Sequence, residues 1–198
     1  MEKDKAYTLE EAVALAQKTS HVKFDATVEL HVNLSVDPRH ADQNIRDNLV
    51  LPAGTGKKVT VAVADDALLE KLEKGTVDFD VLVSTPEFMP KLGKYARLLG
   101  PKGLMPNPKS GTVTTDVDKA VAEAKAGRVE YRVDSAGIVH LGVGKVSFTP
   151  AQLTENIQAV LASIRAAKPG SVKGTYLKAA YLTTSMGPSV TMDVANLG

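Results

Sequence analysis

Residues 23–36 read KFDATVELHVNLSV, and this stretch decides the fold of the region around it. Apolar side chains occupy every second position from Phe24 to Val36, and polar side chains occupy the positions between them. A period of two is typical of a β-strand with one buried face and one polar face. Because Asp37-Pro38 breaks the pattern, we predict one long strand that ends there.

The rest of the two outer segments of the chain predicts two helices and further strands. Thr8 and Glu11 have the spacing of a capping box, which predicts a helix over residues 9–18. Thr149 and Gln152 repeat that spacing before an apolar stripe and predict a second helix. Further strands are predicted at 128–133, 138–141, 175–184 and 189–194, the first two as a hairpin around a turn at 134–137.

The middle of the chain follows another pattern, in which short apolar strands alternate with helices. The strands are expected at residues 59–64 and 79–83, and the helices at 67–74, 86–99 and 116–126, with Gly127 as the final stop. Such alternation predicts βαβ units and a parallel sheet. Residues 38–56, which are polar and then rich in Pro and Gly, indicate a connector.

We therefore expect an α/β chain with two domains. Residues 1–56 and 127–198 form a discontinuous α+β domain with an antiparallel sheet and two helices. Residues 57–126 form an inserted domain of Rossmann-like βαβ type with a small parallel sheet. The two crossings between the domains predict a double-stranded hinge.

Composition excludes several classes of protein. The 198 residues are 43% hydrophobic, carry a net charge of +1 and include no cysteine, which excludes a disordered chain and a disulfide scaffold. No apolar run reaches the roughly 18 residues of a membrane span, and the charged start does not resemble a signal peptide. We expect a cytoplasmic chain. The low net charge argues, at first sight, against a nucleic-acid binder.

The sequence contains few residue patterns that are typical of a catalytic site. The four histidines, His21, His31, His40 and His140, lack the spacing of a metal site. The segment 54–57 resembles a phosphate-binding loop, but Leu51 and Lys58 replace residues that such a loop needs. We expect no enzyme, no cofactor and no metal. A nucleotide-binding α/β enzyme and a protein–protein adaptor that uses a Pro/Gly loop remain the alternatives.

Two loops are unusual. Residues 100–112 hold three Pro and three Gly among lysines. We expect Leu104 and Met105 to be exposed between them, which a connector rarely needs, so a binding loop fits this segment at least as well as a connector does. The segment 89–109 around this loop carries five basic residues and no acid, and so is a candidate phosphate-facing patch. Residues 183–189, TTSMGPS, offer small hydroxyls and backbone N–H groups that suit phosphate and ribose, or else form a plain turn.

Six motifs make the sequence recognisable. They are FDATVE (24–29), DPR (37–39), DQNIR (42–46), LPAGTGK (51–57), LLGPKGLMPNPKSGTV (98–113) and TTSMGP (183–188). Together they closely resemble the bacterial family of large-subunit ribosomal protein one, over nearly the whole chain. The long central motif is highly specific, since chance matches of that length are negligible.

The resemblance implies that the first domain binds a folded segment of large-subunit rRNA. It implies that the second domain faces outward on the mobile ribosomal stalk and assists the release of deacylated tRNA from the exit site. It also implies a translational repressor that binds a similar fold in the messenger RNA of its own operon. A cytoplasmic, ribosome-bound chain that is a monomer off the ribosome is therefore expected.

By position, the rRNA contacts of the family fall on the start of the long strand and on the 183–187 loop. Since Phe24 belongs to the apolar phase, it must turn outward there, where its ring can pack on a ribose or base. The expected RNA-binding residues are Lys23, Phe24, Thr27, Glu29, Lys145, Lys173, Thr183, Thr184, Ser185, Met186 and Gly187. In the loop of the second domain they are Lys102, Gly103, Met105, Asn107 and Lys109.

The sequence departs from the family at two places. It begins close to the first helix, without the basic extension that most members carry. Between Ala64 and Ala67, where members usually have another helix and strand, it has Asp65-Asp66 alone. We therefore expect a smaller sheet in the second domain. The low net charge then predicts recognition by hydroxyls, main-chain amides and a few cations rather than by counterion release.

Overall fold

The computed structural model describes residues 5–196, with Lys109 and Asn196 described by their backbone alone. By its internal contacts the chain divides into two compact units. Unit 1 comprises the residues up to Gly56 and from Val129 onward, and unit 2 comprises Lys57–Arg128. The predicted fold class is confirmed, because the chain mixes helices with an antiparallel sheet and a small parallel sheet.

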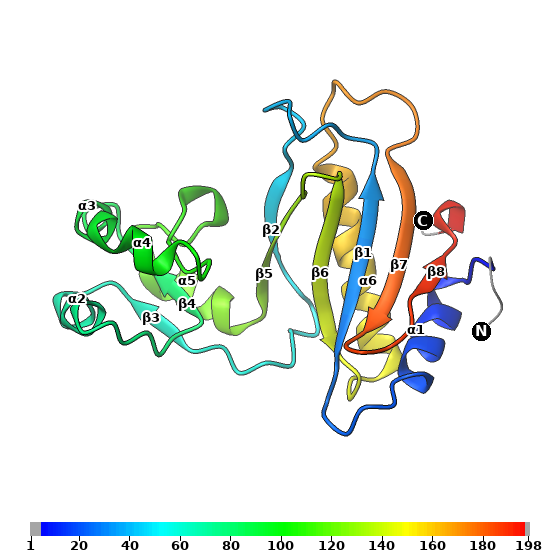
Figure 1. The fold of residues 1–198 in the computed structure, drawn as a ribbon, viewed down its shortest axis with the longest axis horizontal. Coiled ribbons are helices and arrows are strands. Elements are labelled where there is room, and N and C mark those ends of the chain that lie inside the picture. The colour runs from blue at the N-terminus through cyan, green and yellow to red at the C-terminus, as the bar shows by residue number, and fades with distance from the viewer. Residues whose placement is uncertain (1–4, 197–198) are drawn as a thin grey trace. The chain divides into compact units, whose positions relative to one another are not determined.

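Unit 1 is built on a four-stranded sheet in the order β6-β1-β7-β8 (Figure 1). The strands are β1 (Thr27–Leu34), β6 (Ile138–Lys145), β7 (Leu177–Thr184) and β8 (Val190–Met192). β1 pairs antiparallel with both β6 and β7, and β7 pairs antiparallel with β8. Every second side chain of β1 is buried, which confirms the predicted division into a buried and a polar face.

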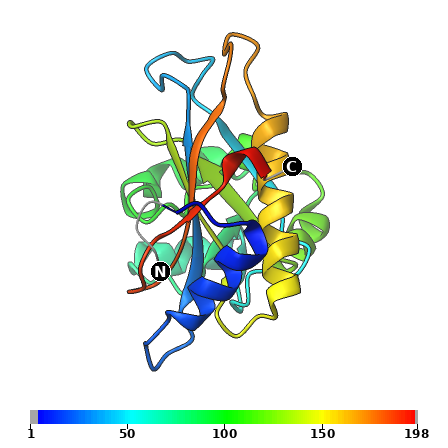
Figure 2. The same cartoon turned by 90° about the vertical axis from the view of Figure 1, so that its right-hand side faces the viewer.

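Two helices cover the buried face of this sheet, α1 (Leu9–Lys18) and α6 (Pro150–Ala166) (Figure 2). Both begin at the predicted capping boxes, in which the Thr8 and Thr149 hydroxyls accept from the backbone N–H three residues later. Their apolar stripes pack with the sheet in one core. A 3-10 turn, η3 (Val194–Asn196), follows β8. Among the described residues, the opposite face of the sheet carries no helix of unit 1.

The long strand is shorter than predicted at its start. β1 begins at Thr27 instead of Lys23, and the chain bends at Lys23 and Phe24. Ala26 is fully buried, but the preceding residues are exposed, so the alternation of side chains there does not correspond to a pleated strand. The bend leaves the Phe24 ring 59% exposed.

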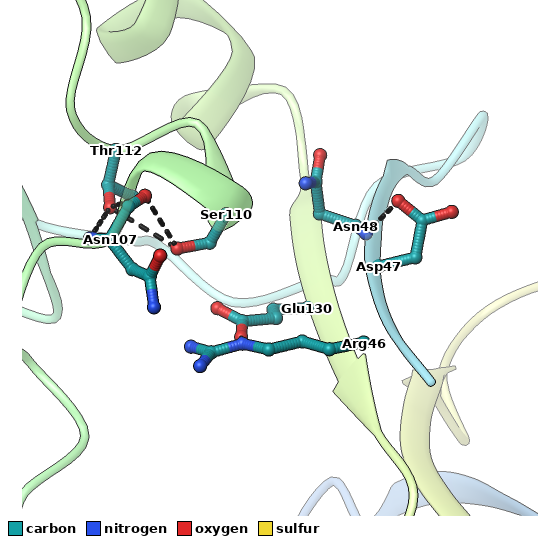
Figure 3. A network of polar contacts seen from close by, with 7 residues as sticks. All are labelled: Arg46, Asp47, Asn48, Asn107, Ser110, Thr112 and Glu130. Atoms are coloured by element: carbon teal, nitrogen blue, oxygen red, sulfur yellow. Dashed lines mark hydrogen bonds and ion pairs between the residues drawn. The ribbon is translucent and has the colours of Figure 1, made fainter. Parts of the chain in front are cut away.

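The connector and the hairpin were predicted wrongly. Residues 38–56 do not form an irregular connector throughout. They contain a strand, β2 (Arg46–Val50), which pairs with β5 (Arg128–Arg132). Arg46 and Glu130 form an ion pair across the two strands (Figure 3). β6 follows β5 after a tight turn, yet the two share one bridge, Val133–Val139. β6 pairs instead along the whole of β1, which buries its alternate apolar side chains beneath α6.

Unit 2 contains the predicted βαβ arrangement. β3 (Val61–Val63) and β4 (Val81–Val83) pair in parallel, joined through α2 (Asp66–Glu73), and Ser84 forms a further parallel bridge with Val113. α5 (Val117–Lys125) leads back to unit 1. The small sheet agrees with the shortened sequence between Ala64 and Ala67.

The single helix predicted over residues 86–99 is wrong. The segment forms α3 (Met89–Leu92), a 3-10 turn η1 (Gly93–Tyr95) and α4 (Ala96–Leu99). Pro90 lacks an N–H and favours the first turn of a helix, so α3 starts late. Gly93 then weakens the helix at the point where it tightens into the 3-10 turn.

Candidate nucleic-acid interface

Three segments of unit 1 that lie far apart in the sequence meet at one end of the four-stranded sheet. The first residue of β1, Thr27, stands opposite Lys145 at the end of β6. The next residue, Val28, stands opposite Thr184 at the end of β7. The structure therefore brings the two predicted patches, around residues 23–29 and 183–187, into one site (Figure 1). We call this site the strand-end surface.

The loop after β7 is held by hydrogen bonds to β1 and within the loop itself. The Ser185 N–H donates to the Thr27 carbonyl at 3.0 Å, and the Gly187 N–H donates to the Thr184 carbonyl at 2.7 Å. The Thr183 hydroxyl lies within 3.4 Å of the carbonyl oxygens of Thr184, Gly187 and Pro188. A Cβ on Gly187 would lie 2.1 Å from the Thr184 hydroxyl, so the turn requires glycine there. These contacts fix the conformation of the loop.

Met186 is the most conspicuous residue of this loop. Its φ of 64° lies in the left-handed region, which costs energy for a residue with a Cβ. Its side chain is 90% exposed, although methionine is among the residues most often buried. Phe24 is a second exposed apolar side chain at the same surface. A strained backbone combined with an exposed apolar side chain is typical of a residue that contacts a binding partner.

Thr184 contributes differently from its neighbours. The residue is 2% exposed, and its hydroxyl has no hydrogen-bond partner among the residues that the structure describes. Its side chain lies beneath the loop and supports Gly187, while the partly exposed Ser185 presents its own hydroxyl.

Lys145 and Asp25 fix the other side of the strand-end surface. The Lys145 Nζ donates to the Thr27 hydroxyl at 2.8 Å and approaches the Asp25 carbonyl at 3.5 Å. The Asp25 carboxylate accepts from both the hydroxyl and the N–H of Ser147, at 2.7 and 3.0 Å. The Ser147 hydroxyl lowers the pKa of Asp25, which keeps this acceptor ionised. Asp25 and Ser147 hold the bend that presents Phe24, and the sequence analysis did not identify them.

The remaining predicted residues of unit 1 do not all join this site. Glu29 stands opposite Thr183 on the open face of the sheet, directly beside the strand-end surface. Lys23 is exposed in the bend before β1. Lys173 is exposed in the loop between α6 and β7. Since β7 starts at Leu177 and ends at Thr184, Lys173 lies at the opposite end of the sheet.

The glycine-rich segment before unit 2 has a structural role. Asn156, fully buried on α6, accepts from the Ala53 N–H at 2.9 Å and donates to the carbonyls of Gly54 and Val143. A Cβ on Gly56 would lie 2.7 Å from the Phe148 ring. Packing and hydrogen bonding thus account for the glycines in this segment. A bound nucleotide is not required to explain its resemblance to a phosphate-binding loop.

The loop of unit 2 differs from its predicted form. Leu104 and Met105, expected to be exposed, are partly buried against the apolar core of unit 2, because its small sheet leaves Leu92 and Leu99 to be covered. Asn107 anchors the rest of the loop, since its carbonyl accepts from the Ser110 and Thr112 hydroxyls at 3.1 and 3.2 Å (Figure 3). The loop is therefore ordered.

Three residues expected in this loop remain exposed or undescribed. Lys102 and Gly103 lie exposed in a turn, where Gly103 has a φ of 70°. The side chain of Lys109 lies outside the described residues. The core position of Met105 makes it a poor candidate for direct RNA contact.

The described residues contain neither a metal-binding cluster nor a membrane-spanning helix. Within residues 5–196, no three or more His, Asp or Glu side chains gather where they could hold a metal ion. No helix in that part of the chain is long and apolar enough to cross a membrane.

Comparison with known proteins gives one consistent result. A family model described as ribosomal protein L1p/L10e matches residues 15–67 and 63–188. Two relatives, both large ribosomal subunit protein uL1 from strains of Lactobacillus delbrueckii subsp. bulgaricus, are 49% identical over 212 residues. Each alignment covers 98% of this chain and 91% of the relative. The two segments of the family match overlap at residues 63–67, which include Asp65-Asp66.

Proposed function

Because the chain belongs to the ribosomal protein L1p/L10e family, we propose that it is a structural protein of the large ribosomal subunit that binds rRNA through the strand-end surface. The family consists of ribosomal proteins and not of enzymes, which sets the nucleotide-binding enzyme aside. The chain acts in the cytoplasm, on the ribosome. Off the ribosome it is a monomer that needs no cofactor.

One observation carries this proposal. The strand-end surface holds a strained, exposed Met186 and an exposed Phe24 on two segments fixed by backbone hydrogen bonds. Folded RNA is recognised by its shape, through ribose hydroxyls, phosphates and the faces of unstacked bases. Backbone amides and hydroxyls suit the first two, and exposed apolar side chains suit the bases. The surface is preformed, so little ordering entropy opposes binding.

The partners beyond rRNA follow from the family resemblance. Unit 1 anchors the chain, and unit 2 faces outward on the stalk, where its exposed lysines, Lys102 among them, contact deacylated tRNA leaving the exit site. A segment of the messenger RNA of its own operon that folds like the rRNA site binds the same surface of unit 1 and represses translation. The tRNA role requires two domains, divided near 56/57 and 126/127.

A binding titration with the stalk segment of large-subunit rRNA tests the proposal. The protein should shift this RNA at submicromolar concentration in moderate salt, and should not shift a hairpin of equal length with a scrambled sequence. Absence of binding to the stalk segment would overturn the proposed function. A competition with the leader of the operon messenger RNA, and with deacylated tRNA, then tests the two finer roles separately.

A further inference from the structure

Two histidines lie in contact at the centre of the open face of the four-stranded sheet. His31 on β1 stands directly opposite His140 on β6, and the two rings meet edge to face with centroids 5.0 Å apart. Their Nδ1 atoms are 2.7 Å apart. Both rings are on the same face as Thr27, Glu29 and Lys145, so this face continues into the strand-end surface.

The outer nitrogens of the pair face carboxylates. The Nε2 of His140 lies 3.3 Å from Asp134 Oδ2, and the Nε2 of His31 lies 3.7 Å from Glu29 Oε2. An imidazole nitrogen that faces a carboxylate carries hydrogen, because two acceptors repel each other. By the same reasoning, the contact between the two Nδ1 atoms requires a hydrogen. Satisfying all three contacts takes three hydrogens, one more than two neutral rings carry, and this corresponds to one positive charge on the pair.

The charged and titratable groups near the pair come from four elements. They are Glu29 on β1, Tyr181 opposite His31 on β7, Asp134 in the turn before β6, and Arg132 on β5 next to the Val133–Val139 bridge. The backbone N–H of Ile138 lowers the pKa of Asp134, so this carboxylate stays ionised beside His140. Burial and the neighbouring His140 lower the pKa of His31, while Glu29 opposes them. Because the two rings are in contact, a proton on one ring opposes a second proton on the other, and the rings titrate as a coupled pair.

We propose that the His31–His140 pair is a further part of the RNA-binding surface, and that it contributes a cation whose charge is one proton shared between the two rings. The proposal rests on the proposed function and adds a pH dependence to it. Without that proton, Glu29 and Asp134 offset Lys145 and Arg132, so this part of the face carries no net charge to attract phosphate. With it, this part of the face carries one net positive charge, which attracts a phosphate of the bound RNA. RNA affinity should therefore rise as the pH falls through the titration of the pair.

An NMR titration of the histidine rings tests the shared proton without RNA. In the wild type, the His31 and His140 resonances should both move in each of two steps, because each step belongs to the pair. Substituting His140→Gln removes the second ring and should raise the pKa of His31. Independent single-step titrations of the two rings, unchanged for His31 in H140Q, would overturn the shared proton.

RNA titrations between pH 8 and pH 6 test its role in binding. We expect wild-type affinity for the stalk rRNA segment to rise about two- to fivefold over this range, the size of one exposed ion pair. The double variant H31Q/H140Q should lose this dependence. The matched control His40→Gln alters an exposed histidine in the loop after β1 and should retain it.

The outcomes separate this inference from the proposed function. Binding by the wild type with the same pH dependence in H31Q/H140Q would overturn the role of the pair and leave the proposed function standing. No binding by any form at any pH would overturn both. Circular dichroism and thermal unfolding establish that the variants are folded in either case.

Discussion

Met186 and Gly187 show how single residues shape the loop after β7. Met186 takes a left-handed φ that glycine would adopt without strain, and its side chain contacts solvent. Gly187 occupies an ordinary φ, but the Thr184 hydroxyl leaves no space for a Cβ. We therefore expect the Met186 side chain to contact the RNA, a contact that the free protein does not make.

Gly187→Ala should destabilise the fold. The added Cβ would lie 2.1 Å from the Thr184 hydroxyl, so the loop or β7 must shift, at a cost of about 1–3 kcal/mol in the free energy of unfolding. The matched control is Gly170→Ala, where a Cβ meets no atom within 4 Å and stability should hardly change. Urea denaturation measures both. Adding Thr184→Ala should relieve part of the G187A effect, and equal destabilisation with and without the hydroxyl would contradict this explanation.

Ser185→Val and Met186→Asp should each weaken binding of the stalk rRNA by about 1–3 kcal/mol, through loss of a polar or an apolar contact. Ser185→Thr retains the hydroxyl in the shape of Val, and Met186→Leu retains an apolar side chain, so both controls should bind nearly as the wild type does. Fluorescence anisotropy with labelled RNA provides the measurement. Unchanged affinity in S185V and M186D would show that the loop is a turn without a role in binding.

At the scale of elements, Asn156 joins α6 to the segment that leads out of unit 1. The side chain is fully buried and bonds to the backbone of Ala53, Gly54 and Val143. A buried amide with three partners fixes the path of the chain more tightly than apolar packing would. It therefore sets the point at which the chain leaves for unit 2.

Asn156→Ala should lower the free energy of unfolding by about 1–3 kcal/mol, because the backbone groups of Ala53, Gly54 and Val143 lose their partner inside the fold. Gln158→Ala, on the exposed side of the same helix, is the control and should be nearly neutral. Thermal or urea unfolding compares the two variants. A neutral N156A would mean that this amide does not hold the connection.

The elements also show how far the sequence allowed the fold to be predicted. The capping boxes located the starts of α1 and α6 to the residue, because the residues that make a cap are neighbours in the sequence. β2 was missed, since its residues RDNLV do not alternate and its partner β5 lies some eighty residues further along the chain. The predicted hairpin was wrong for the same reason, because β6 pairs with the distant β1.

The candidate site was predictable in part. The motif around Met186 drew attention to the loop. The family resemblance assigned an RNA contact to Phe24, and since the strand pattern places Phe24 in the apolar phase, its ring was expected to turn outward. Asp25 and Ser147, whose hydrogen bonds hold the bend that presents Phe24, are 122 residues apart, and nothing in either local sequence indicates the pairing. The exposure expected for Leu104 and Met105 was wrong, because local composition does not reveal which core a loop must cover.

At the scale of the whole molecule, the net charges of the chain segments nearly cancel. Residues 1–56 and 127–198 carry net charges of −3 and +3, which cancel, and residues 57–126 carry +1. The part of the chain that forms the strand-end surface is therefore electrically balanced. Low net charge is compatible with RNA binding where shape and hydrogen bonds dominate.

Replacing residues 58–127 by a flexible Gly/Ser linker should leave unit 1 folded and able to bind the stalk rRNA with an affinity close to that of the full chain. The four-stranded sheet, both long helices and the strand-end surface all lie outside the replaced segment. Cooperative unfolding followed by circular dichroism, together with anisotropy, measures the two properties. An unfolded product would contradict the division into two domains, and a folded product that fails to bind would place the RNA contacts in unit 2.

The salt dependence of rRNA binding tests the central claim most directly. Anisotropy titrations of the stalk segment at several salt concentrations yield the slope of log affinity against log salt, which reports the number of phosphate charges neutralised. Recognition by hydroxyls, backbone amides and exposed apolar side chains, with few cations, predicts submicromolar binding and a slope of about −2 or shallower. A slope several times steeper, or no submicromolar binding, would contradict the account.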